Sequence, residues 1–282
     1  MSILRRPGRR FALGAGIATG GAAAWGLFEA QWVELRELDV PLLRLPRELD
    51  GFRVLHVSDL HLGKLSPAGA ALDRAVSWAN ERPPDLVAVT GDLVRRPGGH
   101  AQLEHALGRL ESRHGIYAVL GNHDVGDARD PFTRPTDLSD LHEAGVTLLR
   151  DEERTIEVGG ARVQVVGVEP AAYKAGRSGP VERADAEADL RILLCHYPEI
   201  VRRLPRGVFD LVLAGHYHGG QICLPTPWGR LRLKDLRGTY WEGLFATEPA
   251  ALHVSRGLGT SFVPFRVLAR PEATILTLRA SN

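Results

Sequence analysis

Polar side chains that can bind metal ions stand in five short blocks of the sequence, each directly after a short apolar run. The blocks are Ser58-Asp59-Leu60-His61, Gly91-Asp92, Gly121-Asn122-His123-Asp124, Cys195-His196 and Gly215-His216-Tyr217-His218-Gly219-Gly220-Gln221. Carboxylate, amide and imidazole ligands suit Mn, Fe, Zn, Co or Ni, and the lack of cysteine at the ligand positions argues against a structural zinc site. Two cations about 3.5 to 4 Å apart need a bridging carboxylate and about three further ligands each, which these blocks can supply.

The spacing within the blocks favours loops that aim these side chains at a common point. Gly91, Gly121 and Gly215 each stand immediately before a candidate ligand. A tight loop that turns side chains inward needs a positive φ or a close approach of two backbone segments, and glycine permits both. Asp59 and His61 are two residues apart, so both can point to one side of an extended segment.

The apolar runs around these blocks predict an alternation of strands and helices. The expected elements are strands at Phe52–Val57, Leu86–Thr90 and Ile116–Leu120, with helices at Leu72–Ala79 and Leu103–Leu110 between them. Later strands are expected at Val163–Val168, Leu190–Leu194, Leu211–Ala214, Leu252–Ser255 and Thr274–Leu278. Helical patterns become rare after Leu141, so the second half should pair its strands more directly. The mixture predicts a layered α/β sandwich with mixed sheets, whose strand ends carry the ligands.

The order of the five blocks resembles the calcineurin-like metallophosphoesterase superfamily. The likeness runs from Asp59 to Gln221, and Gly257-Leu258-Gly259-Thr260 is similar to a segment of the bacterial membrane-associated branch that includes phosphodiesterases of the YkuE and YaeI type. One block alone would be weak, whereas five in the same order are specific. The resemblance implies a four-layer α/β/β/α sandwich with two mixed β-sheets.

The resemblance also implies roles for individual residues. It implies two divalent metal ions (Mn, Fe or Zn), bound by Asp59, His61 and His218 at the first position and by Asn122, His196 and His216 at the second, with Asp92 as the bridge. A hydroxide that bridges the metals would attack phosphorus in line. His123 would contact the phosphoryl oxygen or protonate the leaving alkoxide, and Asp124 would orient it or raise its basicity by hydrogen bonding. Tyr217, where many relatives carry a smaller residue, is expected to point away from the ligands.

Each block has a structural alternative when it is taken alone. Asp92 and Asn122 follow glycines, as ordinary turn residues do, and a single buried histidine such as His196 more often serves packing. The ordered set decides against these alternatives. Histidines outside the blocks are read as structural or solvated: His56, His100, His105, His114, His142 and His253.

Three functions fit the residues. The first is a phosphodiesterase or pyrophosphatase that acts on lipid-linked or nucleotide-linked phosphates. The second is a phosphomonoesterase or phosphoprotein phosphatase. The third is a non-catalytic, metal-loaded envelope protein that binds phosphates without turnover. His123 argues against the third function, because a binding module needs no leaving-group acid.

The first 30 residues predict a signal or anchor segment. Arg5, Arg6, Arg9 and Arg10 precede an uncharged run at 11–28 that is rich in Gly and Ala. Arg9-Arg10-Phe11 is similar to a twin-arginine export signal, although the apolar residue lies one place closer than usual. No clean cleavage site is evident, which favours a retained anchor, a cytoplasmic N-terminus and an extracytoplasmic catalytic domain. The alternative is a surface helix of a soluble protein.

The remaining chain is expected to comprise a linker at 31–50 and a metallophosphoesterase domain at 51–282. Within that domain, Ile222–Phe245 mixes aromatic with basic residues, which fits lipid head groups or, alternatively, amphipathic strands at a sheet edge. The loop Gly126–Thr136 is expected to border the pocket. A net charge of +1 gives no indication of a nucleic-acid partner. Cys195 and Cys223 are too few for a disulfide framework, although one bridge between them is compatible with the sequence.

Overall fold

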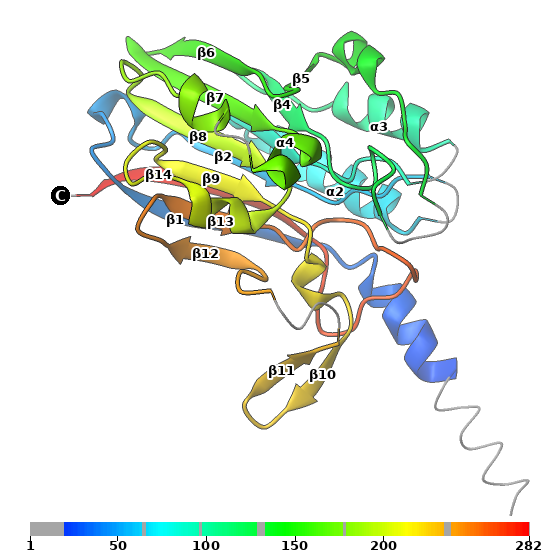
Figure 1. The fold of residues 1–282 in the computed structure, drawn as a ribbon. Helices are drawn as coiled ribbons and strands as arrows, with labels where there is room; N and C mark the ends of the chain where they lie inside the picture. The colour runs from blue at the N-terminus through cyan, green and yellow to red at the C-terminus, as the bar shows by residue number, and fades with distance from the viewer. Residues whose placement is uncertain are drawn as a thin grey trace, which may run out of the picture.

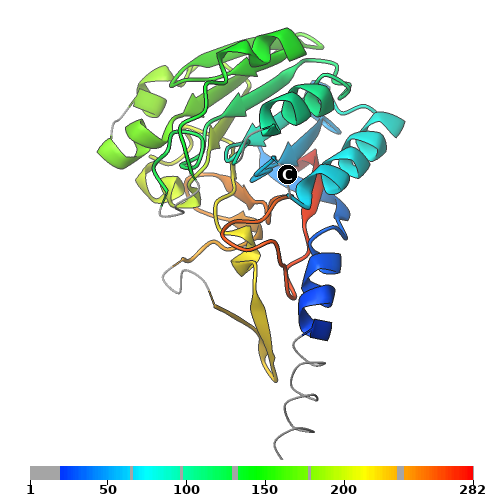
Figure 2. The same cartoon turned by 90° about the vertical axis from the view of Figure 1, so that its right-hand side faces the viewer.

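A computed structural model of the chain shows two β-sheets packed face to face, with helices on both outer sides (Figures 1 and 2). The structure describes residues 20–63, 66–95, 98–128, 133–176, 179–233 and 238–281. The first sheet has the order β1 (Glu34–Leu43), β14 (Glu272–Ser281), β2 (Arg53–Val57), β3 (Leu86–Thr90), β4 (Ile116–Val119) and β5 (Val146–Leu148). The second has the order β12 (Gly243–Ala246), β13 (Ala251–Val254), β9 (Leu211–Ala214), β8 (Leu190–Cys195), β7 (Ala161–Val168) and β6 (Glu153–Val158).

Helices cover the outer face of each sheet. The first sheet carries α2 (Ala68–Glu81), α3 (Gly99–Leu107) and the 3-10 helix η2 (Ser139–Ala144), and the second carries α4 (Pro170–Ala175), α5 (Gly179–Arg183) and the 3-10 helix η3 (Pro198–Arg203). Two further 3-10 turns are η1 (Arg47–Leu49) and η4 (His218–Gly220). The expected four-layer α/β/β/α sandwich with mixed sheets is confirmed.

Alternate residues of the central strands enter different core layers. In β2, Leu55 packs toward α2 and α3, whereas Val54 packs between the two sheets. In β8, Ile192 lies between the sheets, whereas Leu193 packs against η3. Successive side chains of a strand point to opposite faces, so a strand buried on both faces reads as a continuous apolar run. The apolar runs in the sequence therefore predict these strands.

Strand direction places the five polar blocks at one edge of the sandwich. β2, β3 and β4 run parallel to one another in the first sheet, and β7, β8 and β9 do so in the second. The carboxyl ends of parallel strands meet at the same edge, which is where open α/β sheets place their ligands. The loops after β2, β3, β4, β8 and β9 therefore face a common space.

Residues 31–50 are part of the domain rather than a linker. β1 pairs in parallel with β14 along ten residues, from Glu34 opposite Glu272 to Leu43 opposite Ser281. Val40 and Leu42 are buried in the core between the sheets. β1 is an edge strand that alternates buried or half-buried with exposed residues, and the polar residues between Glu34 and Asp39 interrupt any continuous apolar run.

The predicted signal or anchor segment lies only partly within the described residues. Residues 1–19, with the twin-arginine pair, lie outside them, and residues 20–29 are helical. The end of this helix packs on the domain: Glu29 is buried, and its Oε1 accepts a hydrogen bond from the Ala269 amide at 2.8 Å. Within the described ranges, none of the helices combines the length and hydrophobicity that crossing a bilayer requires.

Two further features of the C-terminal half bear on the sequence analysis. β10 (Cys223–Thr226) and β11 (Gly229–Arg232) form a separate two-stranded hairpin that projects from the sandwich, and β12 is the edge strand of the second sheet (Figure 1). Cys195 and Cys223 are both buried and free, so the disulfide left open by the sequence is not formed. Burial raises the pKa of the Cys195 thiol to about 12, which leaves it unreactive.

Candidate metal centre

The structure brings all seven expected ligands to the carboxyl edge of the two sheets. One group comprises Asp59, His61, Asp92 and His218, whose ligand atoms all lie within 4.8 Å of one another. These side chains come from the loops after β2, β3 and β9. Each is almost completely buried, so the two carboxylates have little water to solvate them.

A second group shares Asp92 with the first. The Nε2 atom of His196 lies 3.3 Å from Oδ2 of Asp92 and 3.1 Å from Nδ1 of His216. Asn122 lines the same pocket as Asp92 and His216. Because Oδ2 of Asp92 is also 3.5 Å from Nε2 of His61, this one atom lies between the two groups. That is the position a bridging carboxylate needs.

The donor atoms fit divalent cations. Nε2 of His61 lies 3.2 Å from Nε2 of His218, and two imidazole nitrogens this close need a proton or a cation between them. Oδ1 of Asn122 is buried and has no hydrogen-bond partner among the residues that the structure describes, as expected for an oxygen aimed at an ion. The set consists of oxygen and imidazole nitrogen, which suits Mn, Fe or Zn. The cluster therefore fits a dinuclear metal site.

Neighbouring groups orient two of these ligands. Nδ1 of His196 lies 2.8 Å from the carbonyl oxygen of Thr90, to which it donates, so Nε2 is the ring nitrogen left to bind an ion. Ser58 Oγ donates to Oδ2 of Asp59 at 2.6 Å. The amide of His216 also donates to the Asp59 carboxylate, at 3.1 Å. Such contacts fix the tautomer and the direction of a ligand before the ion arrives.

The loop backbone is strained at the ligand positions. Ten non-glycine residues among those described have positive φ, and five of them are the expected ligands Asp59, His61, Asp92, His216 and His218. Such conformations cost about 1 to 3 kcal/mol each and persist where the surrounding structure enforces them. Gly121 is required by space, because a Cβ there would lie 2.1 Å from Oδ1 of Asp92. Gly91 is required both by its φ of 84° and by its approach to Gly121.

Burial and neighbouring charges shift the pKa values of three of these ligands. Burial raises the pKa of Asp59 to about 6. Burial also disfavours ionisation of Asp92, but the imidazoles of His196, His123 and His61 together outweigh it and hold the pKa of Asp92 well below its usual value. Burial lowers the pKa of His196, whereas the Asp92 carboxylate outweighs that effect and raises it to about 9. A bound cation replaces these protons, so metal binding should release them.

His123 and Asp124 occupy different environments. His123 is buried on the pocket wall, and its Nδ1 lies 2.7 Å from Oγ1 of Thr133. Asp124 instead accepts hydrogen bonds from three backbone amides, those of Leu93 at 2.8 Å, Val94 at 3.1 Å and Gly121 at 2.8 Å. Asp124 thus ties together the loops after β3 and β4. The orienting contact expected from Asp124 is made by Thr133, which lies in the Gly126–Thr136 loop.

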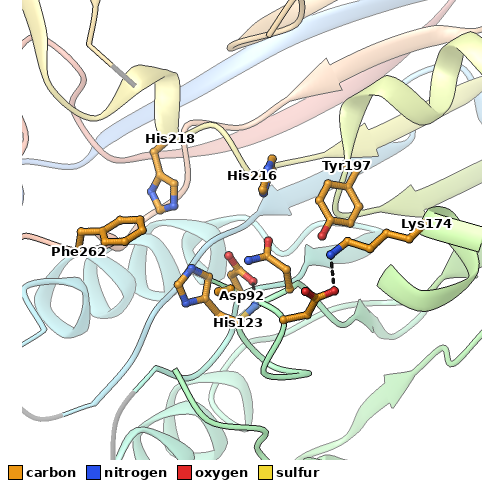
Figure 3. Close-up of a pocket in the computed structure, with 10 residues that line it drawn as sticks. Asp92, His123, Lys174, Tyr197, His216, His218 and Phe262 are labelled. Carbon is orange, nitrogen blue, oxygen red and sulfur yellow. Dashed lines mark hydrogen bonds and ion pairs between the residues drawn. The ribbon is translucent and has the colours of Figure 1, made fainter. Parts of the chain in front are cut away.

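The pocket has two unlike ends. It encloses about 320 Å³, with Phe262 at one end and Lys174 and Tyr197 at the other (Figure 3). Lys174 forms an ion pair with Asp127. Burial raises the pKa of Tyr197, so its hydroxyl stays a hydrogen-bond donor. None of these residues belongs to a recognisable motif, so sequence reasoning does not identify them.

Residues outside the pocket behave largely as expected. Tyr217 points away from the ligands, since its hydroxyl donates to Glu199 at 2.6 Å. His56 and His253 are fully buried below the site, with their Nδ1 atoms 2.7 Å apart. His100 lies 2.9 Å from Asp140 at the surface.

Comparison with known proteins agrees with this geometry. The family model for the calcineurin-like phosphoesterases matches residues 52–220. The chain is 29% identical to the uncharacterized metallophosphoesterase YkuE of Bacillus subtilis, over 96% of this chain and 94% of that protein. It is 30% identical to the phosphodiesterase YaeI of Escherichia coli, over 80% of this chain and 82% of that protein. A transmembrane protein with a metallophosphoesterase domain from Danio rerio is 29% identical, over 93% of this chain and 61% of that protein. The chain therefore belongs to the calcineurin-like phosphoesterase family and is a metal-dependent phosphoesterase.

Proposed function

We propose that this chain hydrolyses phosphodiester or pyrophosphate bonds, in preference to monoesters, with two divalent cations held by the seven clustered side chains. The two cation positions share Asp92 and are completed by Asp59, His61 and His218 on one side and by Asn122, His196 and His216 on the other. The observation that carries the proposal is the position of Asp92 Oδ2, within 3.5 Å of His61 and 3.3 Å of His196. Manganese is the ion we propose to test first.

Protein side chains are proposed to protonate the leaving group and to contact the rest of the substrate. When bound, the cations supply an acidified water and stabilise the charge that develops on the phosphoryl oxygens. His123 is the proposed acid for the leaving oxygen, since its ring lines the pocket and Thr133 fixes its Nδ1. Its Nε2 is then the atom that meets the leaving group. Tyr197 and Lys174, at the other end, contact the part of the substrate that is not cleaved.

A substrate with a group on each side of phosphorus suits the shape of the pocket. Walls extend from the ligand cluster toward Phe262 in one direction and toward Lys174 in the other. A monoester would leave one of these ends without a contact. A relative named as a phosphodiesterase, YaeI, supports the same choice.

We also propose that the chain is anchored to a membrane with its catalytic domain outside the cytoplasm. The support is the run at 11–28, which four arginines precede, and the resemblance to a transmembrane relative. Lipid-linked phosphates are then the natural substrates. Nucleotide-linked phosphates are the second class.

Comparing bis(p-nitrophenyl) phosphate with p-nitrophenyl phosphate, each with added Mn²⁺, Fe²⁺ or Zn²⁺, tests the proposal. We expect a higher kcat/KM for the diester. A higher value for the monoester would favour the phosphomonoesterase function. Stoichiometric metal binding with no turnover of either compound would favour a binding protein.

A further inference from the structure

Exposed apolar side chains gather in three segments of the chain. Among the described residues, eleven of the thirteen large apolar side chains that are exposed belong to these segments. They are Trp25, Leu27, Phe28 and Trp32 near the N-terminus, Leu224, Trp228, Leu231 and Leu233 in or beside the β10–β11 hairpin, and Phe262, Val263 and Leu268 in the loop before β14. We call these eleven residues the apolar face.

Hydrogen bonds and one stacking contact join the three segments. The loop before β14 touches the helical segment, because the Arg266 amide donates to the carbonyl of Gly26 at 3.1 Å and the Arg270 guanidinium stacks 3.9 Å from the Trp32 ring. The same loop pairs with the hairpin, where the amide of Cys223 donates to the carbonyl of Val267 at 2.9 Å. Both views show the three segments at one end of the molecule (Figures 1 and 2).

The side chains are held outward by ordered structure. Trp25, Phe28 and Trp32 form a row, with neighbouring ring centroids 5.6 and 5.5 Å apart. Trp228 lies at the hairpin turn and is 93% exposed. Phe262 and Leu268 have φ values of 61° and 54°, a costly backbone that points to a functional demand. Apolar area of this extent marks an interaction surface.

The face reaches the metal centre through one residue. Phe262 belongs to the face and also lines the pocket, opposite Lys174 and Tyr197 (Figure 3). The pocket therefore has an apolar end that continues into the face and a polar end that does not. A ligand that spans it has to be amphiphilic, with its phosphate between the two ends.

We propose that the apolar face lies on a lipid bilayer and that the pocket receives from it an amphiphilic phosphate ester, its apolar part toward Phe262 and its polar part toward Lys174 and Tyr197. This inference rests on the proposed hydrolysis of phosphate esters. Water adds to phosphorus, the bond to one ester oxygen breaks, and that oxygen takes a proton. In this proposal the apolar part of the ester stays in the bilayer while its phosphate is hydrolysed.

Three observations favour a bilayer over a protein partner. The face begins at Trp25, inside the uncharged run at 11–28, which follows Arg5, Arg6, Arg9 and Arg10. Tryptophans make up three of the eleven side chains, as is typical of membrane–water interfaces. Arg270 stacks on Trp32, in position to meet anionic head groups.

A fluorescent probe on the hairpin tests the docking directly. The full chain carries Trp228→Cys labelled with a polarity-sensitive dye, which is practical because both native cysteines are buried. The matched control is Leu43→Cys, which also replaces an exposed apolar side chain. Leu43 lies at the C-terminal end of β1, about 30 Å along the strand from Glu34, the end of β1 that is next to the face. The vesicles are anionic and contain brominated lipids as quenchers.

The label at 228 should shift to the blue and be quenched, whereas the label at 43 should do neither. Equal behaviour of the two labels on protein that sediments with the vesicles would overturn the docking. So would failure to sediment with vesicles. A blue shift at 228 without vesicles, together with a dimer in analytical ultracentrifugation, would assign the face to a second copy of the chain.

A pair of matched diesters separates docking from chemistry. Methyl p-nitrophenyl phosphate is used in solution, and hexadecyl p-nitrophenyl phosphate is embedded in the vesicles. The double variant Trp228→Ser, Leu231→Ser should lower kcat/KM for the hexadecyl ester by on the order of tenfold and leave that for the methyl ester unchanged. An equal loss on both esters, or no loss on either, would contradict the inference. If the parent chain hydrolyses neither ester, the proposed function fails, while the labels still report docking.

Discussion

The Oγ1 atom of Thr133 lies 2.7 Å from Nδ1 of His123. We predict that Thr133→Val lowers kcat by about tenfold, because the ring of the proposed acid loses its fixed orientation, whereas His123→Ala lowers it by about 100-fold or more. Thr133→Ser, which keeps the hydroxyl, is the control and should stay close to the parent. The measurement is kcat for bis(p-nitrophenyl) phosphate beside metal content. Loss of metal in Thr133→Val would show that the residue supports the ligands instead.

Gly121 is predicted to tolerate no side chain. A Cβ at this position would lie 2.1 Å from Oδ1 of Asp92, so Gly121→Ala must displace the carboxylate or its loop. We expect loss of bound metal and a free energy of unfolding lower by about 1 to 3 kcal/mol. The control is Gly69→Ala in α2, where a Cβ meets nothing within 4 Å. Urea unfolding with metal analysis checks both, and a fully loaded Gly121→Ala variant would refute the assigned geometry.

The buried pair of His56 and His253 should make the fold sensitive to acid. Burial lowers the pKa of His253 to about 4 and holds that of His56 well below its usual value. Because the unfolded chain takes up these protons near pH 6.5 and the folded chain does not, stability should fall as the pH drops from about 6.5 toward 4.

The variant His253→Gln should have a shallower dependence of unfolding free energy on pH, by about 1.4 kcal/mol per pH unit below pH 6. Urea unfolding in EDTA between pH 5 and 7.5 measures it, since EDTA removes the effect of bound metal. His142→Gln, at an exposed position, serves as the control and should keep the parent slope. Parallel curves for the parent and His253→Gln would exclude this buried pair as the source.

The sequence predicts best those structural features that leave a pattern in consecutive residues. Strands buried on both faces, such as β3, read as apolar runs, and the polar residues that end them were visible as blocks. The sequence does not predict β1, because the polar residues of this edge strand interrupt any apolar run and its residue types follow no regular alternation. Its ten pairs with β14, which extend the sheet by one strand, are evident only in the folded chain.

The contacts that support the site are harder to predict from the sequence. Thr133 lies ten positions after His123 in a loop with no motif, and only folding brings the two together. Asp124 stands beside His123 in the sequence, yet its carboxylate bonds to the amides of Leu93, Val94 and Gly121. Residue type alone does not show whether the Asp124 carboxylate contacts the adjacent His123 or these backbone amides. The apolar face likewise joins segments more than 200 positions apart.

Metal content of the Asp92→Ala variant is the most direct test of the central claim. Asp92 Oδ2 is the atom placed between the two groups of ligands. After purification with Mn²⁺ and gel filtration, we predict about two metal ions per parent chain. The variant should hold fewer than one and have no activity, with an unchanged circular dichroism spectrum. An Asp92→Ala protein that still binds two ions per chain would contradict the shared, carboxylate-bridged centre.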